Sequence, residues 1–322
     1  MKNAKSVSVP ETKRSQDSAA FRAVLPRLVR SPALWLFLAV YLLALVIYIP
    51  AGGNGSGLLV ILIYTLYYVL IALLVFPLTA GAPPAAWEEA ADAPRVKMWV
   101  QLVVIAFFLA LYLVLTVVIF SPGSIPGFGS FLLPHSQLTV SIAVACIPVV
   151  CLLPLVILRL LGVGFREMGI GWGYHAWRVA ATGCSAPVVL LVVFFAFGHV
   201  TLHALLLTLG KALLIAALPE EVLFRGVLLT RLVHLLGQQW GIALSLGIFA
   251  LIHLETDLSQ NGSLLLALAD MVLTQAVVGL LLITVFVRTR SLLSGVVLHT
   301  ILDTYGSLIQ FYSVNDMLTP RL

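Results

Sequence analysis

Three short clusters of ionisable residues interrupt long apolar stretches in the last third of the chain. The first cluster contains the adjacent carboxylates Glu220 and Glu221, and Arg225 follows the second of them by four positions. On a helix Glu221 and Arg225 share a face and can form an ion pair, whereas Glu220 points about 100° away. Each such residue costs about 2.5 to 3.5 kcal/mol at the centre of a bilayer. Glu220 is therefore a candidate for chemistry, and a polar kink held by the ion pair is the structural alternative.

The second and third clusters each place two side chains four residues apart, on one face of a helix. They are Phe249 with His253, and His299 with Asp303. A rise of 1.5 Å per residue puts Glu220 about 16 Å from Arg231, His299 about 12 Å from Ser291 and His253 about 22 Å from Gln238. If those three residues mark one membrane surface, antiparallel neighbouring helices can bring all three clusters to one site near mid-membrane.

The residue types in these clusters favour acid–base activation of water. A carboxylate in a cavity of low dielectric constant can act as a general base toward water, and a neighbouring histidine can share or orient the proton. A second histidine with a hydrogen-bonding partner can stabilise the oxyanion of a tetrahedral intermediate. Since no Ser or Cys stands beside a histidine at a suitable spacing, a covalent intermediate has less support.

The elements that must position these side chains are membrane helices. Hydrophobic residues make up 61% of the 322 positions and charged residues only 10%, too few to cover the surface of a soluble domain. Lipid offers no hydrogen bonds to backbone groups, so long apolar runs must be helical. We expect an all-α, polytopic transmembrane bundle of about eight to nine spans, from apolar segments at 34–50, 58–80, 98–120, 138–161, 179–198, 204–234, 240–254, 264–287 and 291–312.

Basic residues predict how the bundle is oriented. Most of the 18 Lys and Arg residues fall on one side of this topology, while the loops 51–57 and 121–137 contain none. This bias indicates a cytoplasmic N-terminus. Residues 1–33 are predicted to be a basic cytoplasmic arm attracted to anionic lipid, residues 34–160 a set of N-terminal spans, and residues 161–322 the catalytic membrane core. The segment 162–178, which mixes aromatic and charged residues, is expected to form an interfacial helix.

The ordered motifs resemble the CAAX protease and bacteriocin-processing family, also called the Abi family. The resemblance covers about residues 160 to 305. It is carried by Glu-Glu-x3-Arg, then Phe-x3-His, then His-x3-Asp, and by the local context of Phe-Arg-Gly at 224–226, Arg-Ser-Leu at 290–292 and Met-Gly-Ile-Gly-Trp at 168–172. The resemblance implies a glutamate-type intramembrane endopeptidase that needs no cofactor and acts on a membrane-associated peptide or protein.

The resemblance also implies roles for the residues of this sequence. Glu220 and His253 would activate the water, and His299 with the residue at 303 would stabilise the oxyanion. The flanking Glu221, Arg225 and Phe249 would shape the site. The third motif of the family usually ends in Asn, whereas this chain has Asp303. Because an ionised Asp only accepts hydrogen bonds, Asp303 serves an oxyanion only if it is protonated, and otherwise it orients His299.

Several other interpretations compete with proteolysis. His199 and His203 could suggest a zinc pair, and two histidines with Glu220 could ligate a metal, but His-Glu-x2-His is absent and no metal is expected. Sequence similarity between the two halves of the chain would favour a proton- or ion-coupled transporter, and the sequence shows none. Asp270 and Gln275 could line a path or bond to neighbouring helices. A non-catalytic scaffold is the other rival. The basic residues flank apolar segments and form no stripe on one module, which argues against a nucleic-acid partner. The expected location is a prokaryotic cell membrane.

Overall fold

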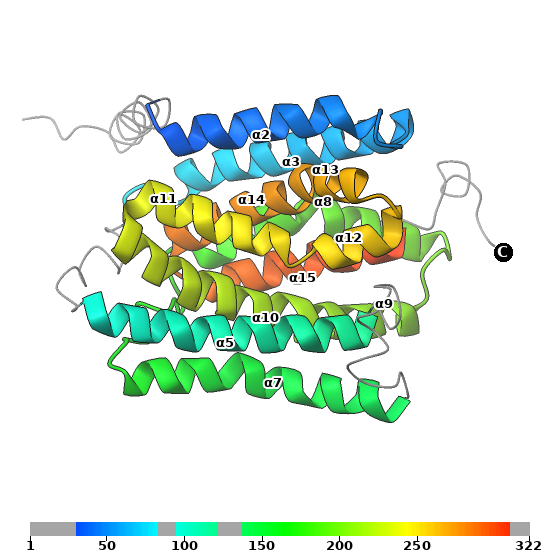
Figure 1. The fold of residues 1–322 in the computed structure, drawn as a ribbon. Helices are drawn as coiled ribbons and strands as arrows, with labels where there is room; N and C mark the ends of the chain where they lie inside the picture. Colours follow the sequence, from blue (N-terminus) through cyan, green and yellow to red (C-terminus); the bar gives the residue numbers. More distant parts are fainter. Residues whose placement is uncertain (1–29, 83–94, 121–136, 310–322) are drawn as a thin grey trace, which may run out of the picture.

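The computed structural model describes residues 30–82, 95–120 and 137–309, and every regular element in these ranges is helical (Figure 1). The all-α prediction is therefore confirmed. Residues up to 196 contribute α2 (Pro32–Tyr48), α3 (Gly55–Leu78), α5 (Arg95–Phe120), α7 (Gln137–Leu160) and α8 (Ala176–Ala196). The remainder comprises α9 (Leu202–Lys211), η1 (Ala212–Ala217), α10 (Leu218–Glu220), η2 (Glu221–Leu229), α11 (Thr230–Leu251), α12 (Leu254–Asn261), α13 (Leu264–Leu273), α14 (Gln275–Thr289) and α15 (Leu292–Ile309).

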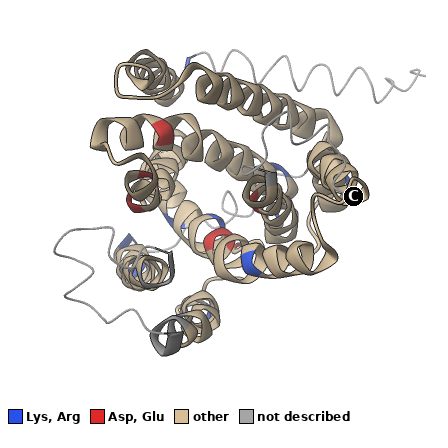
Figure 2. Cartoon of the chain, turned by 90° about the vertical axis from the view of Figure 1, so that its right-hand side faces the viewer, with Lys and Arg blue, Asp and Glu red and all other residues tan. Residues whose placement is uncertain are grey.

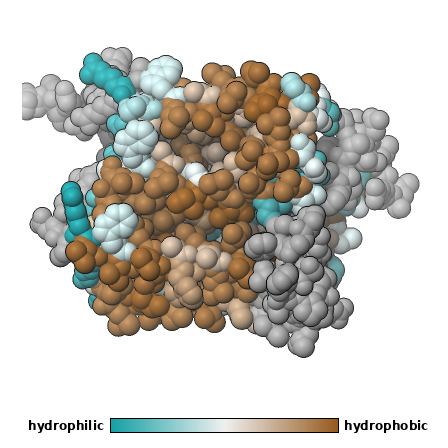
Figure 3. All heavy atoms as spheres, viewed as in Figure 1, coloured by the Kyte–Doolittle hydropathy of each residue, from teal (hydrophilic) through white to brown (hydrophobic). Residues whose placement is uncertain are grey.

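The chain has the surface of a multi-pass membrane protein. Five helical stretches among the described residues are long and apolar enough to cross a bilayer, or six if the bent pair Gln238–Leu251 and Leu254–Asn261 is one span. Figure 3 shows apolar residues across the middle of one face, with more polar residues toward its left and right margins. By length and composition alone, the eight or nine predicted spans are not confirmed. Helix α2, for example, has only 17 residues.

The helices lie side by side in alternating directions along one long axis (Figure 1). Helix α5 packs on α7, α8 on α15, α2 on α13 and α3 on α14. The segment 202–236 runs through the middle of the bundle, where its π-helical parts contact α5, α7 and α15. Viewed end on, charged positions are few among the helices (Figure 2). The first ionisable cluster, which lies on the central segment, is therefore enclosed by α5, α7 and α15.

The central segment is interrupted by two π-helical stretches, η1 and η2, which flank α10. Pro219 in α10 has no backbone N–H to donate to the carbonyl of Ile215 four residues earlier. The hydroxyl of Tyr112 on α5 lies 3.0 Å from that carbonyl oxygen, which is one of two acceptors within reach of its single proton; the other is Glu220 Oε1. π-Helical turns are rare and occur frequently at functional sites. Here η2 begins at Glu221, directly after Glu220 at the end of α10.

The predicted interfacial helix at 162–178 was wrong. Residues 161–175 form turns and bends, and α8 begins only at Ala176. The physical reason is the run of glycines, three of which, Gly162, Gly169 and Gly173, have positive φ angles that a right-handed helix does not allow. The segment instead docks on the turn between α14 and α15, where the Tyr174 amide donates to the Thr289 carbonyl at 2.6 Å.

Some predictions concern residues outside the described ranges. Residues 1–29 of the predicted basic arm, most of the linker 81–97 and nearly all of the loop 121–137 lie there.

Candidate active site

Glu220 lies at the C-terminal end of α10, in the middle of the central segment, and its side chain is only 6% exposed. The Tyr112 hydroxyl lies 3.0 Å from Glu220 Oε1 and can donate to it. The other oxygen, Oε2, is buried without a hydrogen-bond partner among the described residues. Buried carboxylate oxygens are rarely left unpaired. Glu220 Oε2 is therefore the atom at which the site has a free hydrogen-bond acceptor among the described residues.

Two histidines from different helices face that oxygen. His253, just after α11, places Nε2 3.9 Å from Glu220 Oε2, and His299 on α15 places Nε2 at 3.8 Å. Both gaps are longer than a direct hydrogen bond, yet short enough for a water to bridge Glu220 to either histidine. The depth estimate from the sequence allowed these clusters to converge, and the structure brings them together.

The opposite nitrogen of each imidazole is held by a protein group. His253 Nδ1 lies 2.9 Å from the carbonyl oxygen of Phe249 and can donate to it. His299 Nδ1 lies 3.0 Å from Glu221 Oε1. Such contacts fix the orientation of a histidine ring and direct its other nitrogen. In both residues the nitrogen so directed is the one that faces Glu220.

Glu221 and Arg225 form the buried ion pair that their spacing predicts. Their closest N and O atoms are 3.1 Å apart, and both side chains are at most 1% exposed. The Arg225 guanidinium also lies over the Phe249 ring, 4.1 Å from its centroid. Phe249 in turn packs against His253, with ring centroids 4.9 Å apart. The three residues thus form a rigid support behind the two histidines.

Asp303 lies at the open side of the cluster. Its Oδ1 is 3.5 Å from His299 Nε2, and its side chain is 34% exposed. The His253 side chain is 20% exposed, in contrast to the enclosed Glu220. The cluster is therefore most accessible on the side of Asp303 and His253.

The sequence interpretation missed Tyr112. This residue is 1% exposed and is the contact of α5 with the carboxylate of Glu220. A signal for it was available, because Tyr112 lies eight residues, or about 12 Å, inside the end of the apolar run 98–120. A phenol at that depth needs a hydrogen-bond partner within the protein.

The other polar residues considered in the sequence take no part in this cluster. Asp270 accepts a hydrogen bond from Asn261 at 3.3 Å, so it bonds to a neighbouring helix. His199 packs between the rings of Phe194 and Phe197. No group of three or more His, Cys, Asp or Glu side chains in the described part of the chain is arranged to hold a metal ion.

The fold and this cluster define a polytopic helical membrane protein with a buried acid–histidine centre. Residues 202–305 match the family described as "Type II CAAX prenyl endopeptidase Rce1-like", which confirms the resemblance to the CAAX protease family for this part of the chain. The match begins at α9 and includes all three motifs. It supports a membrane endopeptidase of the CAAX-protease type. No match was found among curated proteins or among solved structures.

Proposed function

We propose that this chain is an intramembrane endopeptidase that hydrolyses peptide bonds with water activated by Glu220 and His253. The observation that carries the proposal is the unpartnered Glu220 Oε2, which faces the Nε2 atoms of His253 and His299. The family match supports the same class of reaction and does not favour a transporter or a scaffold.

In the proposed reaction, Glu220 takes a proton from water while the water oxygen attacks the carbonyl carbon of the scissile bond. The same proton then passes to the leaving amine as the C–N bond breaks, so no covalent enzyme intermediate forms. His253 holds the water, because its Nδ1 is engaged by Phe249 and its Nε2 is directed at the gap. Tyr112 keeps Glu220 Oε1 occupied, which presents Oε2 to the water.

His299 is proposed as the donor to the oxyanion. With Glu221 accepting from Nδ1, a protonated Nε2 points to the region between Glu220 and Asp303. Asp303 is proposed to orient His299 before substrate binds, since its Oδ1 lies 3.5 Å from the same nitrogen, and the oxyanion takes the place of Asp303 as the acceptor during the reaction. Arg225 is proposed to act through Glu221 and Phe249 without touching substrate.

The Asp303 assignment predicts different outcomes for two substitutions. Asp303→Asn keeps the oxygen that faces His299, so cleavage should stay within about threefold of the wild type. Asp303→Leu removes that oxygen, and cleavage should fall on the order of 10²-fold, the typical cost of disabling one oxyanion-stabilising group. Initial rates on one reporter peptide compare the two variants directly. If Asp303→Leu is as active as Asp303→Asn, Asp303 does not orient His299.

The substrate is proposed to be a membrane-associated peptide or protein segment. The chain is proposed to cross a prokaryotic cell membrane with its N-terminus in the cytoplasm. The helix directions agree with nine passes if Leu202–Leu236, the bent pair Gln238–Leu251 with Leu254–Asn261, and α13 with α14 each count as one. Under this topology the ends of the bundle that carry Arg159, Arg231 and Arg288 face the cytoplasm.

Cleavage of a membrane-anchored reporter peptide by the purified full chain tests the proposed function. We expect cleavage to persist after treatment with a strong zinc chelator, because the proposed mechanism uses side chains only. Inactivation by the chelator and recovery on addition of Zn²⁺ would replace the proposed mechanism with a metal-dependent one. Peptides that accumulate in cells expressing an inactive variant supply candidate sequences for the reporter.

A further inference from the structure

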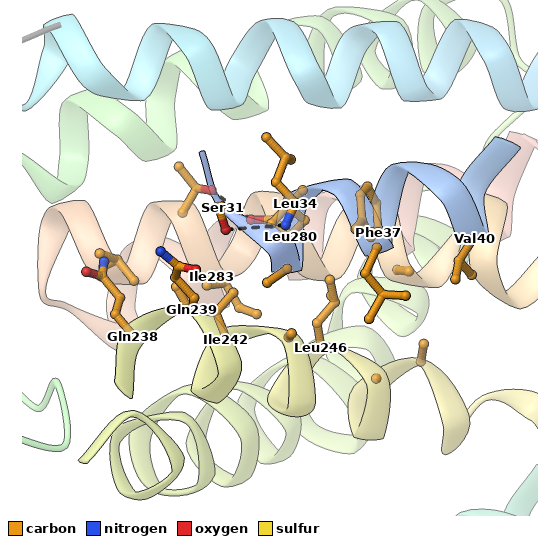
Figure 4. Close-up of a pocket in the computed structure, with 18 of the residues that line it drawn as sticks. Ser31, Leu34, Phe37, Val40, Gln238, Gln239, Ile242, Leu246, Leu280 and Ile283 are labelled. Atoms are coloured by element: carbon orange, nitrogen blue, oxygen red, sulfur yellow. Dashed lines mark hydrogen bonds between the residues drawn. The ribbon is translucent and has the colours of Figure 1, made fainter. Parts of the chain in front are cut away.

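An apolar groove separate from the acid–histidine cluster lies between α2, α11 and α14 (Figure 4). Its volume is about 710 Å³, which is in the range of pockets that hold small amphiphilic molecules. Leu34 and Phe37 of α2, Leu246 of α11 and Leu280 of α14 are among its walls. None of the proposed catalytic side chains lines it. The groove is therefore a second candidate site in the same bundle.

The groove is open to the surface of the bundle that faces lipid. Leu36, Val40 and Leu251 line it and are 52%, 41% and 54% exposed. The part of α2 that lines it runs from Ser31 to Val40, a length of about 14 Å. That is close to half of the roughly 30 Å hydrocarbon core of a bilayer. The length of the groove along α2 therefore matches the thickness of one leaflet, which suits one hydrocarbon chain of a bilayer lipid.

One end of the groove is polar and positively charged. Ser31, Gln238 and Gln239 lie together at this end, and Phe37 and Val40 lie toward the other (Figure 4). Arg288 also lines the groove and is held in place by donating to the side chain and carbonyl of Thr79. Among the described residues, no carboxylate forms an ion pair with Arg288. A positive charge beside a polar rim is the complement of an anionic headgroup.

Gly247 on α11 lines the groove and helps to keep it deep. A Cβ at this position would meet no other atom within 4 Å, and the φ angle of Gly247 is not positive. Neither close packing nor backbone conformation therefore requires glycine here, although glycine weakens a helix interior relative to alanine. A larger residue at 247 would instead project into the open space of the groove.

From these observations we infer that the groove between α2, α11 and α14 binds one anionic glycerophospholipid. One acyl chain lies along Leu34, Phe37 and Leu246, and the headgroup lies beside Arg288, Gln238 and Gln239. A bound lipid of this kind joins α2, which lies outside the family-matched residues 202–305, to α11 and α14 within them. The inference does not depend on the proposed catalytic chemistry.

Native mass spectrometry of the full chain tests the inference. The detergent-solubilised protein is mixed with equal amounts of phosphatidylglycerol and phosphatidylcholine, and the retained lipid is measured. The wild type should retain one phosphatidylglycerol in preference to phosphatidylcholine. Gly247→Phe fills the groove and should lower its occupancy by at least about tenfold, because the acyl chain loses much of its buried apolar area. Gly210→Phe is the matched control, since Gly210 is also helical with open space around it and does not line the groove.

Two sets of results would overturn the inference. Equal retention of the two lipids excludes recognition of an anionic headgroup at Arg288. Equal occupancy in the two phenylalanine variants, or displacement of the lipid by detergent alone, excludes the groove as the binding site. Glu220→Gln should retain the lipid as the wild type does, so a failure of the catalytic proposal is distinguished from a failure of this one.

Discussion

Glu220→Gln is expected to abolish peptide hydrolysis, with a loss of at least about 10²- to 10⁴-fold in kcat, the usual contribution of a positioned general base. Glutamine has nearly the same size, and its amide can still accept the hydrogen bond from Tyr112. It cannot take a proton from water. The substitution therefore removes the base and leaves the packing around it. Cleavage of the membrane-anchored reporter peptide at saturating concentration measures the loss.

Two companion variants sharpen this experiment. Asp270→Asn makes the same carboxylate-to-amide change on α13, where Asp270 bonds to Asn261 and takes no part in the acid–histidine cluster, and it should leave cleavage unchanged. Tyr112→Phe keeps Glu220 and removes the hydroxyl that engages its Oε1, so it should lower kcat by a smaller factor, on the order of tenfold. If Glu220→Gln cleaves the reporter at the wild-type rate while folded in the membrane, Glu220 is not the base.

The sequence was most informative where residue type and spacing carry a physical cost. The apolar runs predicted helices because lipid leaves the backbone no other partner, and the described elements are all helical. The three clusters predicted a meeting point because ionisable groups in apolar surroundings must find one another. The spacing of four between Glu221 and Arg225 likewise predicted their ion pair.

The same reasoning failed where the determining contacts come from distant parts of the chain. Aromatic and charged residues at 162–178 suggested an interfacial helix, yet Gly162, Gly169 and Gly173 impose positive φ angles and the segment docks on the α14–α15 turn. The contact of Tyr112 with Glu220 has no signal in the local sequence, because the two residues lie 108 positions apart. The π-helical stretches η1 and η2, on either side of α10, are also not predicted by the apolar pattern of the segment.

Arg225→Met is expected to be the most destabilising substitution in the site. Glu221 is fully buried, and removing Arg225 leaves its charge with His299 as the remaining polar contact. Breaking a buried ion pair from one side typically costs about 3 to 5 kcal/mol of unfolding free energy, because the other charge remains in a medium of low dielectric constant. Arg225→Met also removes the guanidinium from the Phe249 ring and the donor to the Gly279 carbonyl. Reversible unfolding in mixed micelles measures the change.

A double-substitution cycle separates the ion pair from these other contacts. The variant carrying both Glu221→Gln and Arg225→Met has no buried charge left unpaired, so it should be more stable than Arg225→Met alone. Arg159→Met is the matched control, because Arg159 is exposed near the end of α7 and its loss should change stability by no more than about 0.5 kcal/mol. If the double variant is as unstable as Arg225→Met, the cost comes from the other contacts of Arg225, with the Phe249 ring and the Gly279 carbonyl. In that event Arg225 supports His253 through the aromatic ring, and the charge of Glu221 serves chiefly to hold His299.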